Sequence, residues 1–286
     1  MQFKVKGQIS ALELAEALGL QLKGSASQLL LTVGSLSNEN SSVLKFTNKL
    51  EKQYLNGIVI GSKDNNAESL IVSDNPRLDF CRALQYLLDI SILINDSAES
   101  VINHTALISA TATIESGVSI GQNSIIEHNV TIHKGTVIGD NTIIRSNSVI
   151  GAQGFGFEKS TGGSWIRFPH LGRTIIGSNV EIGALNSICV GALENTVISD
   201  GVKTDNLVHI AHNCQIGKNS ILTACTELSG GVILGEGVWM GPNSSTLQKI
   251  KIGDSAVVGL GSVVTKNVDS GHIVAGIPAK VIRRLK

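Results

Sequence analysis

The chain has 286 residues, of which 42% are hydrophobic and 16% charged, and its formal net charge is zero. A balanced charge argues against nucleic acid or an anionic membrane as the main partner, because both attract strongly basic proteins. No stretch approaches the roughly 18 apolar residues of a membrane span, and the N-terminal MQFKVKGQIS lacks the apolar core of a signal peptide. We therefore expect a cytoplasmic protein with no membrane span.

Residues 1–97 carry no repeat and are predicted to form a small α/β domain. Ser10 followed three residues later by Glu13 is the pattern of a capping box, which predicts a helix that runs to Leu18. The remaining elements expected in this domain are short strands and one longer helix. They are the strands Leu29–Val33, Ile58–Ile60 and Leu70–Val72, and a helix over about Leu78–Leu88.

The middle of the chain repeats with a period of six. Isoleucine occupies every sixth position from Ile102 to Ile150, and an aliphatic residue or threonine does so again from Ile198 to Val264. A six-residue period is typical of a β-helix, in which each hexad supplies a short strand and a turn. Asparagine tolerates the left-handed backbone of tight corners, and six asparagines fall there: Asn123, Asn129, Asn141, Asn147, Asn179 and Asn219. The fold class is thus mainly β, with a parallel β-helix over residues 98–270.

One interruption is expected, the inserted loop 151–174, and residues 271–286 form a C-terminal segment. A β-helix tolerates an insertion at a corner, from which it protrudes as a loop. This loop carries four of the ten aromatic residues of the chain, namely Phe155, Phe157, Trp165 and Phe168. Aromatic residues gathered on a loop favour a functional or interfacial role, but the sequence does not choose between this role and packing.

The cysteines show no spacing typical of a metal site. Cys81, Cys189, Cys214 and Cys225 include no CxxC pair and are expected to be free thiols. We expect no metal and no resident cofactor.

Six stretches, spread over both domains, carry a resemblance to a known family. They are LELAEALGLQLKG, LIVSDNPRLDFCRAL, GAQGFGFE, FPHLGRTIIGSNVEIGA, GALENTVISDGVKTDNLVHIAHNCQIG and TACTELSGGVILGEGVWMG. Through these stretches the chain resembles the UDP-3-O-(3-hydroxyacyl)glucosamine N-acyltransferases of lipid A biosynthesis, which belong to the hexapeptide-repeat acyltransferase superfamily. The resemblance implies a left-handed helix in which three hexads make one coil, a homotrimer, and an active site in the groove between subunits.

The implied reaction is the attack of a sugar amine on a thioester, which needs a base with a pKa near 7, and histidine is the natural candidate. His212 matches the family's general base, with His209 as the other candidate for that role. Gly230 follows His212 by one full coil of three hexads, so it should stack over His212 and present its N–H to the thioester oxygen. The family places its oxyanion amide at the matching glycine.

The resemblance also implies residues that bind the acceptor, a nucleotide-linked amino sugar. Asp205, Asn206, His209 and Asn213 are candidates to orient His212 or to bind the sugar. An aromatic ring of the N-terminal domain stacks on uracil in the family, and Phe46, Asn48 and Tyr54 occupy the matching region of this chain, with a spacing that differs by about two residues.

The donor is left open between acyl carrier protein and a coenzyme A thioester. The chain closes with VAGIPAKVIRRLK, which resembles the ending of sugar acetyltransferases that use acetyl-coenzyme A. Lys249, at a position where the family carries a second histidine, is assigned to the donor side. Ala275, Gly276 and Lys280 of the ending are assigned there too.

Three functions compete. The first is an N-acyltransferase of the lipid A type that uses acyl carrier protein. The second is a coenzyme A-dependent N-acyltransferase or N-acetyltransferase that makes a modified UDP- or dTDP-amino sugar for O-antigen or other surface glycans. The third is a non-catalytic trimeric scaffold, against which the intact motif around His212 argues.

Overall fold

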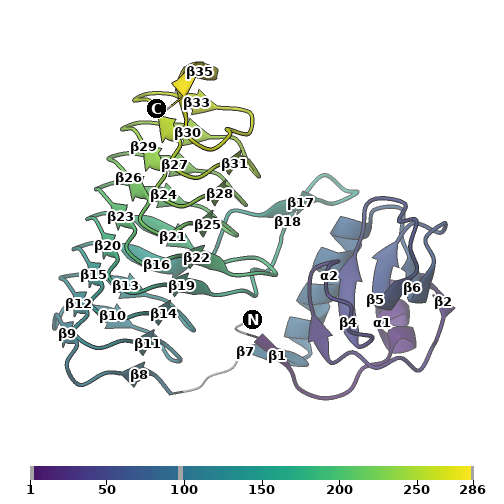
Figure 1. Ribbon diagram of the computed structural model, residues 1–286. Coiled ribbons are helices and arrows are strands. Elements are labelled where there is room, and N and C mark those ends of the chain that lie inside the picture. The colour runs from purple at the N-terminus through teal and green to yellow at the C-terminus, as the bar shows by residue number, and fades with distance from the viewer. Residues whose placement is uncertain (1–2, 96–98, 285–286) are drawn as a thin grey trace. The chain divides into compact units, whose positions relative to one another are not determined.

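The computed structural model describes residues 3–95 and 99–284, which form two compact units (Figure 1). The first unit comprises Phe3–Asp96 together with Gly156–Pro169, and the second comprises Ser97–Phe155 and His170–Lys286. The predicted fold class, a small α/β domain followed by a left-handed parallel β-helix, is confirmed. The expected boundary between residues 97 and 98 lies outside the described residues.

The first unit contains two helices and a five-stranded sheet in the order β2-β6-β5-β4-β3. The predicted capping box is present at the start of α1, and the predicted strands and second helix lie within the observed ones or overlap them. Strands β1, β2, β4 and β7 were not expected. Strand β4 does not alternate apolar and polar residues, and it buries Lys45. The bounds are β1 Phe3–Val5, α1 Ala11–Leu18, β2 Gln21–Gly24, β3 Thr32–Val33, β4 Val43–Phe46, β5 Leu55–Gly61, β6 Ala67–Val72, α2 Pro76–Asp89 and β7 Leu93–Asn95.

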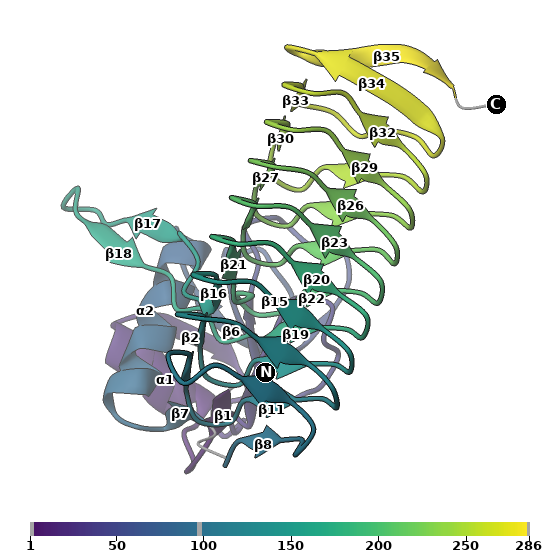
Figure 2. The same cartoon turned by 90° about the vertical axis from the view of Figure 1, so that its left-hand side faces the viewer.

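The second unit is a three-sided solenoid of parallel sheets, whose stacked coils are seen from the side in Figure 2. We name each face after its first strand. The β8 face consists of β8 Val101–Ile102, β11 Ser119–Ile120, β14 Val137–Ile138, β19 Thr174–Ile176, β22 Thr196–Ile198, β25 Gln215–Ile216, β28 Ile233–Leu234 and β31 Lys251–Ile252.

The other two faces follow the same pattern. The β9 face consists of β9 Leu107–Ile108, β12 Ile125–Ile126, β15 Ile143–Ile144, β20 Glu181–Ile182, β23 Lys203–Thr204, β26 Ile221–Leu222, β29 Trp239–Met240, β32 Val257–Val258, β34 His272–Gly276 and β35 Ala279–Arg284. The β10 face consists of β10 Thr113–Ile114, β13 Thr131–Ile132, β16 Val149–Ala152, β21 Ser187–Cys189, β24 His209–Ile210, β27 Glu227–Leu228, β30 Ser245–Thr246 and β33 Val263–Val264.

Consecutive coils pair in register, and over most of the solenoid the partners stand three hexads apart in the sequence, as Leu222 and Met240 do. The aliphatic residue of the hexad points inward and is buried, as Ile210 and Leu222 are. The six asparagines expected at corners all have left-handed backbone, with φ between 52° and 64°. Burial of one aliphatic side chain per hexad therefore builds the core, and the corners turn without glycine at each step.

A second interruption was not predicted, and the expectation of a single one is wrong. Lys203 pairs with Ile221 on the next coil, and these two residues are three hexads apart in the sequence. Glu181 pairs with Lys203 on the coil before, and the sequence separation between these two residues is longer than three hexads. The additional residues lie between β21 and β22, in a loop over residues 190–195 that we call the 190–195 loop. The prediction missed this loop because the six-residue period was assigned only to Ile102–Ile150 and to Ile198–Val264, and the loop lies between these two runs.

The insertion after β16 forms a hairpin of β17 Phe157–Lys159 and β18 Trp165–Arg167, and this hairpin belongs to the first unit. Its Phe168 ring lies 6.0 Å from the ring of Phe80 in α2, and the Cys81 thiol donates a hydrogen bond to the carbonyl oxygen of Arg167 at 3.1 Å. Phe168 therefore has a packing role at the end of the insertion, whereas Trp165 in β18 is 66% exposed and Phe155 is 88% exposed.

The solenoid ends in a hairpin. Strand β34 continues the β9 face by pairing with β32, and β35 returns antiparallel to β34 with a bulge at Ile282. Neither of the two helices in the described part of the chain is long and apolar enough to cross a membrane.

Candidate functional site

The candidate base His212 lies at a corner of the solenoid directly after β24. Ile210 is buried in the core, and Asn213 turns the chain with a left-handed conformation, with φ at 63°. The His212 side chain is half-buried, so solvent or a ligand can reach it. The fold thus presents this histidine from a rigid corner.

Asn213 determines which nitrogen of His212 carries hydrogen. The N–H of Ala192 donates to the side-chain oxygen of Asn213 at 3.0 Å, and a backbone N–H can only donate, so this atom is the carbonyl oxygen. The same oxygen lies 2.9 Å from Nδ1 of His212. Since an amide oxygen only accepts, Nδ1 is the protonated nitrogen of a neutral His212, and Nε2 keeps its lone pair.

Gly230 lies against the His212 ring on the next coil. The N–H of Gly231 donates to the His212 carbonyl at 2.8 Å, which joins the two corners. A Cβ atom at Gly230 would lie 2.7 Å from Cε1 and 2.8 Å from Nε2 of His212, so only glycine fits without moving the ring. The Gly230 N–H has no acceptor within the part of the chain that the structure describes. Gly230, with an amide that can still donate, therefore lies against the edge of the ring that carries Nε2.

A second imidazole, not anticipated from the sequence, lies at this site. His170 is buried, and its ring centroid is 5.0 Å from that of His212 with an interplanar angle of 70°. It follows the hairpin in the stretch FPHLGR, which was noted only as part of the resemblance. A histidine flanked by buried apolar residues where an insertion rejoins the solenoid was the available signal.

The remaining acceptor candidates of the solenoid lie on or near β24. His209 points outward from this strand, between Ser187 and Glu227 on the neighbouring coils. Asp205 and Asn206 are exposed at the corner before β24, whereas His212 lies at the corner after it. Of these polar neighbours, Asn213 makes the hydrogen bond to the base, and Asp205 and Asn206 lie at the opposite end of the strand.

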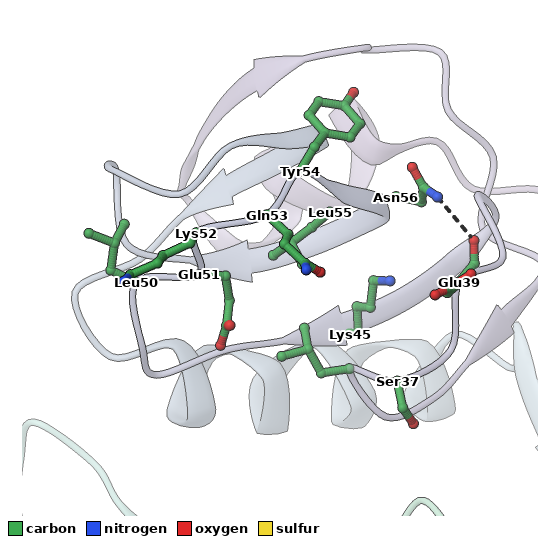
Figure 3. Close-up of a pocket in the computed structure, with 11 residues that line it drawn as sticks. Ser37, Glu39, Lys45, Leu50, Glu51, Lys52, Gln53, Tyr54, Leu55 and Asn56 are labelled. Carbon is green, nitrogen blue, oxygen red and sulfur yellow. Dashed lines mark hydrogen bonds between the residues drawn. The ribbon is translucent and has the colours of Figure 1, made fainter.

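The first unit contains a pocket of about 660 Å³ (Figure 3). The Tyr54 ring borders this pocket and is 56% exposed, which leaves its faces open to a flat ligand. Lys45 lies against the pocket, and its ammonium donates to the carbonyl oxygen of Asn38 at 2.7 Å. Burial lowers the pKa of Lys45, while the nearby Glu39 acts in the opposite direction.

Phe46 does not share this pocket with Tyr54. Consecutive residues of a strand point to opposite faces of the sheet, so Phe46 points away from the face on which Lys45 borders the pocket. The Phe46 ring packs on Phe80 of α2 with a centroid distance of 4.8 Å. Asn48 is exposed and is not among the residues that line the pocket. Of the three residues expected to hold a uracil ring, the structure leaves Tyr54 available in a pocket.

The donor candidates lie in two places. Lys249 is exposed at a left-handed corner, with φ at 61°, and its N–H donates to the Gly230 carbonyl at 3.0 Å. Ala275, Gly276 and Lys280 lie together in the terminal hairpin, where Ala275 pairs with Lys280. Lys249 is therefore one coil beyond the amide donor of Gly230.

The bulge in β35 places two cations on one face of the hairpin. Lys280 pairs with Ala275 and Arg283 pairs with Ile273, and Ala275 and Ile273 are two residues apart on the same side of β34. Paired residues of antiparallel strands point to the same face, so Lys280 and Arg283 share a face. Arg284 pairs with His272 and lies on the other one.

Three of the four cysteine thiols are buried. Burial raises the pKa of Cys81 to about 11 and that of Cys214 to about 12, and it raises the pKa of Cys189 as well. All four cysteines are free, and only Cys225 of the four is exposed. Among residues 3–95 and 99–284, no group of three or more His, Cys, Asp or Glu side chains is arranged to hold a metal ion.

Comparisons with known proteins identify relatives. The family described as bacterial transferase hexapeptide (six repeats) matches residues 117–152 and 195–230. The UDP-3-O-acylglucosamine N-acyltransferase of Dechloromonas aromatica is 57% identical over 86 residues, which are 30% of this chain and 24% of that protein. The enzyme of the same name from Campylobacter lari is 39% identical over 130 residues, 46% of this chain and 41% of that protein. These matches span less than half the length of either relative.

Two solved structures share the fold. The UDP-N-acetylglucosamine acyltransferase from Campylobacter jejuni superposes with a TM-score of 0.56 at 24% identity, over 65% of this chain and 73% of that one. The UDP-N-acetylglucosamine acyltransferase of Francisella novicida gives a TM-score of 0.54 at 24% identity, over 64% of this chain and 67% of that one. At this identity the likeness concerns the β-helix alone.

The two aromatic candidates of the first unit should differ sharply in their effect on stability. Phe46→Ala removes a ring packed on Phe80 and should lower the free energy of unfolding by roughly 2–3 kcal/mol. Tyr54→Ala removes a largely exposed ring and should change it by less than about 0.5 kcal/mol. Urea unfolding of the two variants measures the difference. Equal losses would contradict the placement of the two rings on opposite faces.

Proposed function

We propose that the chain is an N-acyltransferase of the hexapeptide-repeat type, because two of its stretches match the bacterial transferase hexapeptide family and it is similar to the UDP-3-O-acylglucosamine N-acyltransferases. It moves an acyl group from a thioester to the amine of a nucleotide-linked amino sugar, in the cytoplasm and for lipid A or lipopolysaccharide synthesis. The observation that carries this proposal is a histidine whose hydrogen bond to Asn213 leaves the Nε2 lone pair available, with Gly230 packed against the same edge of the ring.

Each part of that site has a step to perform. Nε2 of His212 takes a proton from the sugar amine as the amine nitrogen attacks the thioester carbonyl carbon. The carbonyl oxygen becomes an oxyanion and accepts a hydrogen bond from the Gly230 N–H. The tetrahedral intermediate then collapses, the carbon–sulfur bond breaks, and the proton held by His212 passes to the leaving thiolate. Asn213 holds the imidazole in the required tautomer throughout.

The acceptor is bound through its nucleotide and its sugar. The Tyr54 ring offers a flat, exposed face for a nucleobase at the mouth of the pocket in the first unit. His209 points outward from β24, the strand just before the corner that holds His212, and this position suits a contact with the sugar. Asp205 and Asn206 are further acceptor candidates at the far end of that strand, and Phe46 and Asn48 have no place in the pocket that contains Tyr54.

The donor is a thioester of acyl carrier protein or of coenzyme A, and one observation favours coenzyme A. Phosphate groups bind best to two or three cations gathered at one place. Lys280 and Arg283 share a face of the terminal hairpin beside Ala275, which has a small side chain. The second candidate function is therefore a coenzyme A-dependent N-acyltransferase that makes a modified nucleotide amino sugar for surface glycans.

We further propose a homotrimer. Most outward positions of the two-residue strands on the β9 face are apolar, namely Leu107, Ile125, Ile143, Ile221, Trp239 and Val257, and Leu107 is 65% and Trp239 45% exposed. An apolar face of this kind is stabilised when another chain covers it. Light scattering should give three times the mass of one chain at micromolar concentration. A monomer mass would contradict the trimer and a site shared between subunits.

His212→Ala should lower kcat by roughly 10²- to 10⁴-fold, the usual effect of losing a general base. Binding of the UDP-amino sugar should change less than twofold, because the nucleotide contacts lie in the first unit. The measurement is steady-state transfer to a UDP-amino sugar, with titration calorimetry for binding and His209→Ala as the matched variant. Near-normal turnover of His212→Ala would remove it from the mechanism, and loss only in His209→Ala would make His209 the base. No transfer by the unmodified protein from any thioester would favour a scaffold.

The donor can be decided with paired variants of the terminal hairpin. The double variant Lys280→Ala/Arg283→Ala should raise KM for acyl-coenzyme A thioesters about 10-fold or more, because each cation can form charge-assisted hydrogen bonds to phosphate. Arg284→Ala, on the opposite face, is the control and should leave KM within twofold. The assay compares short and long acyl groups on coenzyme A and on acyl carrier protein. If the double variant keeps its KM for every donor, the basic ending takes no part in donor binding.

A further inference from the structure

His170 has no part in the steps above, yet its ring packs against that of the candidate base. It is only 2% exposed, which excludes direct contact with a sugar or a thioester in this conformation. Its ring meets that of His212 in a T-shaped arrangement with centroids 5.0 Å apart. Whatever His170 contributes must therefore pass through His212.

Gly154 lies against both histidines. A Cβ atom at Gly154 would lie 2.5 Å from Nε2 of His170 and 3.0 Å from Cβ of His212. Contacts under 3.0 Å force something to move, and here the neighbours are an imidazole ring and the first side-chain atom of the base. The backbone at Gly154 thus fits against both histidines, and a methyl group does not.

The backbone around His170 is anchored to the loop that also supports the base. The N–H of Leu171 donates to the carbonyl oxygen of Ala192 at 2.6 Å, and the N–H of Ala192 donates to Asn213. Asn213 in turn holds Nδ1 of His212. The 190–195 loop is therefore bound on one side by the residue that follows His170 and on the other by the residue that follows His212.

We propose that His170 is a positioning residue for His212: its buried ring fixes the orientation of the His212 imidazole so that Nε2 points at the reacting amine. The terminal torsion of a histidine side chain is broad, with no narrow staggered wells. The hydrogen bond to Asn213 holds Nδ1, but a half-buried ring can still tilt about that point. Packing against a second ring removes this freedom, and a misplacement of about 1 Å in a catalytic group can cost 10²-fold in rate.

This inference rests on the proposed function, because it takes His212 as the base. The two proposals can fail separately, because His212 could act as the base without any help from His170. A positioning role lowers kcat when it is lost and leaves the sugar-nucleotide KM unchanged. A merely structural role would lower the melting temperature and change kcat little.

The test is a double-mutant cycle on His170 and Gly154 in the full chain. His170→Ala should lower kcat about 10- to 100-fold with KM for the UDP-amino sugar within twofold. Gly154→Ala should lower kcat to a similar degree, because the new methyl group displaces the rings. In the double variant the methyl group enters space that His170 has vacated, so the second change should add less than threefold. Gly162→Ala, where a Cβ atom would meet only the Ser160 hydroxyl at 3.9 Å, is the matched control.

A spectroscopic readout follows the ring itself. In protein labelled with ¹⁵N-histidine, the shifts of His212 should report the Nδ1-protonated tautomer in both proteins, because Asn213 holds it. The ring resonances of His212 should be sharp in the unmodified chain and broadened in His170→Ala, where the ring samples more orientations. Near-normal kcat in His170→Ala, together with a large loss in His212→Ala, would overturn this inference and leave the proposed function standing. Near-normal kcat in both would reject the proposed base as well. If His170→Ala does not fold, Gly154→Ala decides alone, and unchanged kcat in that variant overturns the inference.

Discussion

The registered pairing of each coil with the next is the constraint on which the rest of this molecule depends. A strand of two residues has little stability alone, and it persists because its backbone groups pair with the coils on both sides and its inward residue joins a continuous core. Residues that stand three hexads apart are therefore neighbours in space wherever the coils are unbroken. The approach of Gly230 to His212 is a direct result, since no local feature of either segment would bring them together.

The same constraint explains why the informative departures are insertions. Strand pairing leaves room for additional residues only at corners, and both insertions in the solenoid occur at corners. One of them contributes Gly154 and His170 where it leaves and rejoins the solenoid, and the other contributes Ala192, which orients Asn213. The regular coils hold the base and the amide donor rigidly, while the irregular segments determine how the base is oriented. Stability and chemical specificity thus come from different parts of the sequence.

Most of the fold could be predicted because a six-residue period is a strong and repeated signal. The isoleucines from Ile102 to Ile150 share one period, which a β-helix brings to a single side of every coil, and Ser10 with Glu13 marks the start of a helix locally. Strand β4 could not be predicted in this way, since its buried Lys45 contradicts the hydrophobic pattern of a strand. The structure of the inserted hairpin also escaped prediction, because its position depends on long-range contacts such as that between Phe168 and Phe80.

The candidate site shows the same division. His212 and Gly230 could be selected from the motif and the one-coil spacing, and Asn213 from its adjacency, because all three belong to regular coils. His170 is separated from His212 in the sequence by the second insertion and lies at the end of the first, so no periodic argument connects the two histidines. Phe46 and Tyr54 both fall in the region that the resemblance assigns to the uracil ring, but strand alternation separates them: the residue next to Phe46 borders the pocket, and Phe46 itself packs on α2. Residues close in the sequence thus share a site only where the periodicity of their helix or strand places both side chains on the same face.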